Sequence, residues 1–257
     1  MTNRVAQAAL ERALENDDLL LHYQPIHDTV SSRIVAAEAL LRQMRESGEV
    51  REAKVIAEAA ENSPALFALS SRTMLTAFDD ASQWYETHGL RLHVNVSARE
   101  FVERDIVSTA TAALSSSKLA PQAVVFEITE TTYIERPKDV IGDMEKLRGA
   151  GFALWLDDFG TGHSSLLHLR HFPLDGLKIA AEFIARLESD RRCRAISRSL
   201  IEVAHELDLK VVAEGVERES QREILAEWDC DFIQGFLFNR PMSTERFQQL
   251  LTSGGAA

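Results

Sequence analysis

Two adjacent aspartates, Asp157 and Asp158, end an apolar run and lead directly into the segment FGTG at residues 159–162. This order predicts a buried strand that presents two carboxylates at its C-terminal end and then turns. Neighbouring carboxylates repel each other, and a divalent cation relieves the repulsion when both face one cavity. Asp158 alone could equally be the N-cap of a helix, so the choice between a metal site and a cap depends on the rest of the chain.

Other polar residues lie where further predicted strands end. Short apolar runs predict strands at residues 19–26, with a stop at Pro25, and at 34–41, 91–96, 123–128, 152–156, 174–179, 210–213 and 232–233. Glu38 lies inside the second run, where a buried acid is costly unless it is paired or binds a metal. The polar residues at or near the C-terminal ends of different strands are Asn95, Glu127, Asp157, Lys178, Glu214 and Gln234.

The stretches between these strands are mostly helical in pattern. We expect helices at about residues 4–16, 49–86 with a break near Pro64, 101–115, 140–148, 184–207, 219–227 and 244–251. This alternation predicts an α/β fold, a (β/α)8 barrel of TIM type, with a doubly wound open sheet as the competitor. The barrel is favoured because it brings the polar strand ends to one face. We expect a single domain over residues 1–257, with the first helix packed on a barrel at about 19–251.

Composition excludes several classes of protein. The chain has 28 basic and 40 acidic residues and a net charge of −12, which argues against general nucleic-acid binding. No apolar run approaches the roughly 20 residues that span a bilayer, so we expect no membrane insertion and a cytoplasmic location. Cys193 and Cys230 lie far apart, which indicates neither a disulfide framework nor a zinc cluster.

The barrel would gather five carboxylates and an amide around one lysine. These hard oxygen ligands suit Mg²⁺ or Mn²⁺ better than structural zinc. There are too many acids for one ion, so a pair of ions bridged by Asp157 or by a hydroxide is the better interpretation, and such pairs hydrolyse phosphate esters. Lys178 is the candidate to steady the attacking water or the charge that develops on phosphorus.

Eight ordered segments then resemble a known family. They are YQPI (23–26), EALLR (38–42), NVS (95–97), EITE (127–130), DDFGTG (157–162), LKI (177–179), AEGVE (213–217) and QGF (234–236). In this order they resemble the EAL-domain cyclic-di-GMP phosphodiesterases, over about residues 10 to 247. The resemblance implies a TIM-type barrel with an aberrant, antiparallel first strand. It also implies hydrolysis of the bacterial second messenger cyclic di-GMP to linear pGpG with two Mg²⁺ or Mn²⁺ ions, and Ca²⁺ that binds but inhibits.

The same resemblance implies roles for individual residues. The metal ligands would be Glu38, Asn95, Glu127, Asp157, Asp158 and Glu214; the catalytic residues would be Lys178, which holds the water, and Glu214 as a possible general base, together with Glu38 and Asp157. Substrate contacts would come from Gln24, Leu41, Arg42, Glu217, Gln234 and Phe236. The loop residues Phe159, Gly160, Thr161 and Gly162, tethered by Glu130, would couple the site to a homodimer interface that includes the following helix. A sensor domain upstream is also expected of the full-length protein.

One departure from the family pattern affects the metal site. Ala180 follows the LKI segment where the family usually carries Asp, and His163 stands where Tyr is common. The loss of a carboxylate beside a metal centre commonly costs roughly 10- to 100-fold in affinity or activity.

Three functions therefore stay open: an active phosphodiesterase, a degenerate barrel that binds the nucleotide without cutting it, and a protein-interaction domain. The nearly complete metal set argues against the third.

Overall fold

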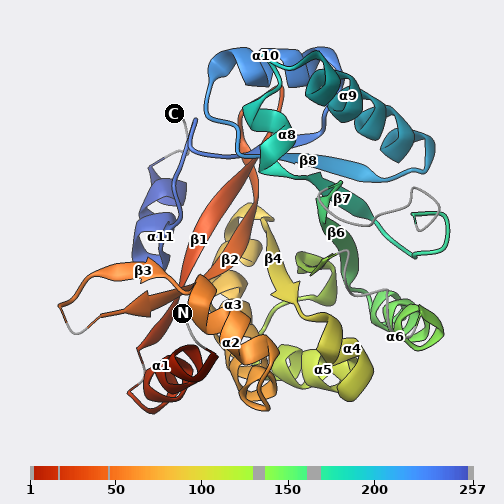
Figure 1. Ribbon diagram of the computed structural model, residues 1–257. Coiled ribbons are helices and arrows are strands. Elements are labelled where there is room, and N and C mark those ends of the chain that lie inside the picture. Colours follow the sequence, from red (N-terminus) through yellow and green to blue (C-terminus); the bar gives the residue numbers. More distant parts are fainter. Residues whose placement is uncertain (1–2, 17, 46, 130–136, 161–168, 254–257) are drawn as a thin grey trace.

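The computed structural model describes residues 3–16, 18–45, 47–129, 137–160 and 169–253 (Figure 1). The strands are β1 (Leu19–Asp28), β2 (Ile34–Met44), β3 (Val50–Glu52), β4 (Arg91–Val96), β5 (Val124–Thr129), β6 (Ala153–Phe159), β7 (Gly176–Ile179), β8 (Lys210–Glu214), β9 (Phe232–Gln234) and β10 (Met242–Ser243). The helices are α1 (Asn3–Glu15), α2 (Lys54–Glu61), α3 (Ala65–His88), α4 (Ala98–Glu103), α5 (Ile106–Ser116), α6 (Pro137–Gly149), α8 (Ala181–Ala185), α9 (Arg191–Glu206), α10 (Glu219–Glu227) and α11 (Thr244–Thr252).

Eight of these strands close into a barrel, as the sequence predicts. Their order is β1-β9-β8-β7-β6-β5-β4-β2, and β2 pairs back onto β1. Strand β1 is antiparallel to both of its neighbours, β2 and β9, whereas all other neighbours in the barrel are parallel. Strands β3 and β10 lie outside the closed ring and extend β2 and β1. The antiparallel first strand and the TIM-type barrel are therefore confirmed.

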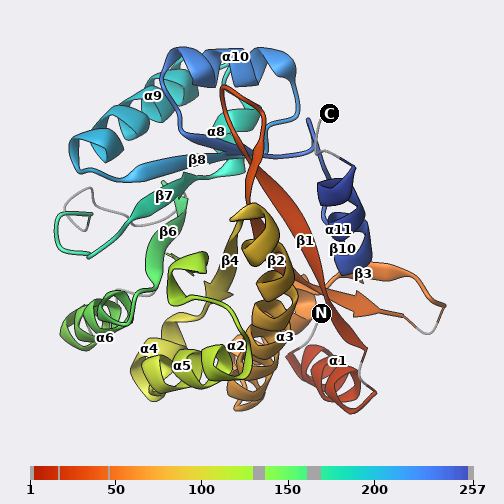
Figure 2. The same ribbon diagram turned by 180° about the vertical axis from the view of Figure 1, so that it is seen from behind.

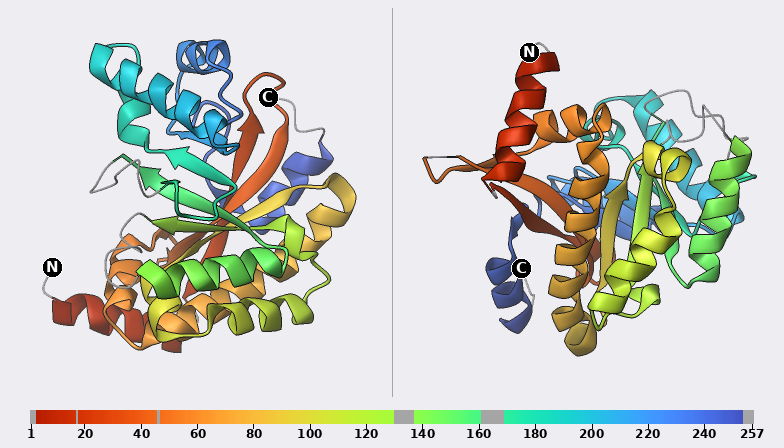
Figure 3. Two further views of the ribbon diagram at one scale, coloured as in Figure 1. Left: turned by 90° about the vertical axis from the view of Figure 1, so that its right-hand side faces the viewer. Right: turned by 90° about the horizontal axis from the view of Figure 1, so that it is seen from below.

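The helices surround the barrel and enclose its main core. Helix α9 packs beside β7 and β8, with α10 next to it, and α3 packs beside β4, with α4 and α5 on the same side (Figures 2 and 3). Because side chains alternate along a strand, one set of apolar residues packs outward under the helices, for example Val94, Phe126 and Leu177. No helix in the described part of the chain is long and apolar enough to cross a membrane.

A smaller apolar layer fills the inside of the barrel. It is built by Ile26, Ala36, Val125, Trp155 and Val212. The Trp155 indole occupies the space beside Gly176, where an added Cβ would lie 2.5 Å from the ring, so this position of β7 accepts no larger residue without a shift. The layer closes one end of the barrel interior and supports the polar residues above it.

Several expected element boundaries were wrong. Strand β1 continues through Pro25 to Asp28. The residues before Pro25 pair with β10 and those after it pair with β9, so Pro25 itself belongs to neither pairing. The N–H that proline lacks is therefore not needed for a hydrogen bond to either strand. The expected helix at 101–115 is two helices, since the Asp105 side chain accepts a hydrogen bond from Ser108 N and starts α5. In the same way Asp190 caps α9 and separates it from α8. Residues 50–52 form β3 rather than the start of a helix, because they pair with β2 as a hairpin.

Candidate functional site

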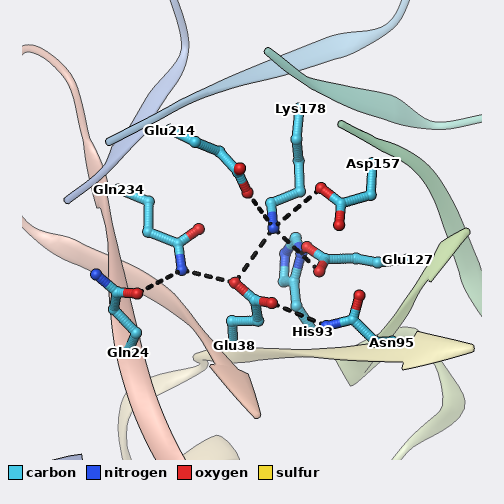
Figure 4. A network of polar contacts seen from close by, with 9 residues as sticks. All are labelled: Gln24, Glu38, His93, Asn95, Glu127, Asp157, Lys178, Glu214 and Gln234. Carbon is cyan, nitrogen blue, oxygen red and sulfur yellow. Dashed lines mark hydrogen bonds and ion pairs between the residues drawn. The ribbon is translucent and has the colours of Figure 1, made fainter. Parts of the chain in front are cut away.

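Lys178 lies at the centre of a ring of carboxylates inside the barrel. Its side chain is 1% exposed, and its neighbours in β7 pack outward, so the ammonium points into the barrel (Figure 4). Lys178 Nζ lies 3.2 Å from Glu38 Oε2, 3.1 Å from Glu127 Oε2, 3.4 Å from Asp157 Oδ1 and 2.5 Å from Glu214 Oε1. These four acids come from β2, β5, β6 and β8, so barrel closure is what brings them together. Their charges hold the pKa of Lys178 above its usual range, although burial alone would lower it.

Three amide side chains complete the network around Glu38. Asn95 Nδ2 donates to Glu38 Oε1 at 2.8 Å, and Gln234 Nε2 donates to Glu38 Oε2 at 2.7 Å and to Gln24 Oε1 at 3.3 Å. Burial favours the neutral form of Glu38, but the Lys178 charge and these hydrogen bonds together lower its pKa. Glu38 is therefore a carboxylate, and the sequence-based concern about a lone buried acid is resolved by its partners.

His93 is a further member of the site that sequence reasoning missed. Its Nδ1 lies 2.7 Å from Glu127 Oε1, and its ring packs edge-on against Trp155. Burial, with the nearby Lys178 charge, lowers the pKa of His93 to about 3. The contact is therefore a hydrogen bond between Glu127 and a neutral imidazole rather than an ion pair. The available signal was position, since His93 lies two residues before Asn95 on β4 and so shares its face.

Glu38, Asp157, Asp158 and Glu214 face an open cavity of about 300 Å³, whereas Glu127 is fully buried. Oxygen atoms of Asp157, Asp158 and Glu214 lie within 4.8 Å of one another. Burial and the neighbouring negative charges raise the pKa of Asp158, and burial raises that of Glu214 to about 7. The cavity is lined by Gln24, Glu38, Leu40, Asp157, Asp158, Ala181, Glu214, Gly215, Glu217, Gln234, Gly235 and Phe236.

The donor set of this cavity fits divalent cations. In the described part of the chain four carboxylates contact one ammonium and a fifth, that of Asp158, lies beside two of them, so acidic groups outnumber the cation. Asp157 Oδ1 and Gln234 Oε1 are buried acceptors without a hydrogen-bond donor among the described residues, and Lys178 at 3.4 Å gives Asp157 only a charge contact. Carboxylate and amide oxygens of this kind are the ligands that Mg²⁺ and Mn²⁺ prefer.

A model of the EAL domain matches residues 7–241. The chain belongs to the EAL domain family. This EAL domain is 33% identical over 246 residues to signaling protein YkoW of Bacillus subtilis, a match that covers 95% of this chain and 31% of that protein. It is 34% identical over 244 residues to the cyclic di-GMP phosphodiesterase NbdA of Pseudomonas aeruginosa, covering 94% of this chain and 31% of that protein. The chain thus spans about a third of the length of these relatives.

The same family membership holds at the level of structure. The solved complex of the PaMucR phosphodiesterase with c-di-GMP superposes with a TM-score of 0.89 at 33% identity and covers 94% of this chain and 99% of that chain. The shared fold includes the closed barrel that brings the acids to one end.

Not every residue expected to contact substrate lies at the cavity of this EAL domain. Leu41 packs outward against the helices and lines a different cavity between β1 and α3, whereas Leu40, two residues after Glu38, faces the site. Successive side chains of β2 point to opposite faces of the strand, which is why Leu40 rather than Leu41 faces the cavity. Arg42 lies farther along β2, opposite Leu20 of β1 and Glu52 of β3, and is not part of the cavity wall.

The loop residues divide into two groups. Phe159 is buried in the outer core, and Gly160 follows at the end of β6. Glu130, Thr161, Gly162 and His163 lie outside the described residues, so the expected tether and the loop roles remain predictions. Ala180 is 2% exposed and forms the N-cap of α8 without a side-chain hydrogen bond.

Proposed function

We propose that this EAL domain hydrolyses one phosphodiester bond of cyclic di-GMP and releases linear pGpG, with two Mg²⁺ or Mn²⁺ ions bound. The observation that carries this proposal is the ring of carboxylates around Lys178 beside an open cavity. Relatives named as cyclic di-GMP phosphodiesterases and a structural neighbour in complex with c-di-GMP support the choice of substrate.

The chain offers ligands for two ions on the two sides of Asp157. Glu38, Asn95, Glu127 and Asp157 would hold one ion, and Asp157, Asp158 and Glu214 would hold the other. Bound divalent ions polarise the phosphoryl oxygens and lower the pKa of a coordinated water, which is the chemistry that two-ion sites supply to phosphodiester hydrolysis.

The remaining roles fall to side chains that already touch one another. Lys178 donates hydrogen bonds to the attacking water and offsets negative charge on the reacting phosphate. Glu214, which contacts Lys178 at 2.5 Å, is the candidate to accept the proton of that water. Gln24, Gln234, Glu217 and the half-exposed Phe236 line the cavity and hold the dinucleotide. Arg42 extends this surface along the same face of β2 and reaches the part of the ligand outside the cavity.

Four further properties belong to the same proposal. Ca²⁺ would fill the acidic site but support no turnover, because its larger, looser coordination holds the reacting groups poorly. The loop at residues 159–162 and the helix after it would form a homodimer contact. Residues 1–257 would act as a single domain in the cytoplasm, and the domain would follow a sensor domain in the full-length protein, since its relatives are about three times longer.

A second candidate is a receptor that binds cyclic di-GMP without cutting it. The observation that favours it is Ala180, whose buried methyl group stands where the family usually carries a carboxylate.

One assay decides between hydrolysis and binding alone. The purified chain is incubated with cyclic di-GMP and Mg²⁺ or Mn²⁺, pGpG is followed by chromatography, and binding is measured in parallel in Ca²⁺. Formation of pGpG that a chelator abolishes is the result expected of the phosphodiesterase. Tight binding in Ca²⁺ without any product identifies a receptor, and neither binding nor product contradicts both candidates.

A further inference from the structure

Helix α8 lies between the two strand ends that carry the acids of the second cation site. It follows β7 directly, and β7 pairs with β6 on one side and with β8 on the other. Asp157 and Asp158 belong to the end of β6, and Glu214 is the last residue of β8. Two side chains of α8, Ala181 and Phe183, are two positions apart, so they point to different sides of the helix.

On one side, Phe183 packs directly against Gly160. A Cβ added to Gly160 would lie 2.9 Å from Phe183 Cε2 and 3.2 Å from Cζ, so the ring lies close against one side of the glycine. Gly160 has a φ of 99°, and Asp158, two residues earlier, has a φ of 52°. A positive φ is unfavourable for a residue with a side chain and persists only where the surroundings enforce it. Among the described residues, the Phe183 ring is the close neighbour of Gly160 in this turn.

On the other side, Ala181 packs against Gly215. A Cβ added to Gly215 would lie 2.6 Å from Ala181 Cβ, and Gly215 also has a positive φ, 69°. Gly215 directly follows Glu214. Helix α8 is therefore in contact with the turn after Asp158 and with the turn after Glu214 at the same time.

The far end of α8 is anchored by a buried amide. Gln221 Nε2 donates to Ile184 O at 2.8 Å, and Gln221 Oε1 accepts from Glu217 N at 2.9 Å and from Arg218 N at 3.0 Å. The amide links α8 to the backbone that continues from Gly215. The helix thus has fixed contacts at both ends and cannot shift toward one strand without breaking them.

We propose that Phe183 is a positioning residue, which holds Asp158 in its left-handed conformation so that Asp157, Asp158 and Glu214 present their oxygens to one divalent cation. This inference rests on the proposed function, because it concerns the second ion of that site. Loss of the ring would let the turn at Gly160 relax and the Asp158 carboxylate turn away from Glu214. The first ion, held by residues on the other side of Asp157, would keep its ligands.

The test is Mn²⁺ binding to wild type and to Phe183→Ala, measured by calorimetry for stoichiometry and by electron paramagnetic resonance for coupling between two ions. Phe67→Ala is the matched control, since Phe67 is also a half-buried aromatic but packs in the separate cluster under α1 and α2. We expect Phe183→Ala to bind the second Mn²⁺ roughly 10- to 100-fold more weakly and to lose the coupled signal, with the first ion unchanged. Phe67→Ala should bind both ions as wild type does, even if its Tm falls.

Mn²⁺ binding to the wild type distinguishes failure of the proposed function from failure of the role of Phe183. Wild-type protein that binds no pair of Mn²⁺ ions contradicts the proposed function. Wild type that binds two ions together with Phe183→Ala that binds them equally well overturns the role of Phe183. Should Phe183→Ala fail to fold, Phe183→Leu carries the test, because it keeps an apolar side chain but removes the ring that lies against Gly160. Selective loss of the second ion is expected there, and unchanged binding of two ions overturns the inference.

Discussion

Lys178 Nζ and Glu214 Oε1 lie 2.5 Å apart at the end of two neighbouring barrel strands, with almost no solvent at the lysine. This is the shortest of four contacts between Lys178 and a carboxylate. The lysine is the positive charge that allows the acids to lie together in the cation-free protein. Removing it leaves buried negative charge uncompensated, and the consequences are measurable.

Lys178→Met should destabilise the cation-free protein by about 3–5 kcal/mol at pH 8, the usual cost of breaking a buried ion pair. The measurement is chemical denaturation in the presence of a chelator. Added Mg²⁺ should restore much of the lost stability, since the cation replaces the missing positive charge. Lys146→Met, which removes an exposed lysine of α6, is the control and should change stability little. Equal effects of the two substitutions would show that the ring of acids needs no internal cation.

The raised pKa of Glu214 predicts how stability depends on pH without cations. Burial raises this pKa from 4.5 to about 7, so between these values the folded state binds a proton that the unfolded chain has lost. The free energy of unfolding therefore falls as pH rises from about 4.5 to about 7, and the loss is complete above that window. Glu214→Gln should flatten this part of the profile. The measurement is a series of urea titrations in chelator, and an identical pH profile for the two proteins would contradict the assignment.

The sequence predicts those residues of the site that lie at the C-terminal end of a strand. Strand β4 was located at its observed bounds, and Asn95, Lys178 and Glu214 were placed correctly because the end of an apolar run is visible in one sequence. His93 was missed because a histidine within an apolar strand has no distinguishing pattern of its own. Its partner, Glu127, comes from the next strand along the chain, and the parallel pairing of β4 with β5 brings the two together.

The alternation of side chains along β2 places Leu40, rather than Leu41, on the face of Glu38, and the expected substrate contact of Leu41 stays a prediction. Other features of the site depend on long-range contacts. The packing of α8 depends on two such contacts, of Phe183 with Gly160 and of Ala181 with Gly215, whose residues lie 23 and 34 positions apart along the chain. The sequence shows glycines there but not what covers them.

Glu38→Ala should abolish cation-dependent formation of pGpG. Glu38 accepts hydrogen bonds from two amides and contacts Lys178, so its loss removes a proposed cation ligand and frees three donors at once. The measurement is product formation at saturating Mg²⁺ or Mn²⁺, with circular dichroism to verify folding. Glu202→Ala, an exposed acid of α9, is the control for a general effect of charge. Full activity of a folded Glu38→Ala protein would contradict the ligand assignment.

Ala180→Asp should raise turnover at limiting Mn²⁺ without changing the fold. The gain should be up to about 10- to 100-fold, because the substitution restores a carboxylate beside the proposed metal ligands. Ala180 is the N-cap of α8 and offers no side-chain acceptor, so a new carboxylate there can accept from the first turn of the helix that positions Asp158 and Glu214. The charge also adds a sixth acid near the cavity, and in chelator the substituted protein should be less stable at high pH. Ala180→Asn separates the two effects because it caps the helix without a charge. A gain with Asp alone identifies the carboxylate as the missing group, and an equal gain with Asn assigns it to the capping of α8. No gain with either substitution would mean that the site has adapted to alanine, and the prediction would be wrong.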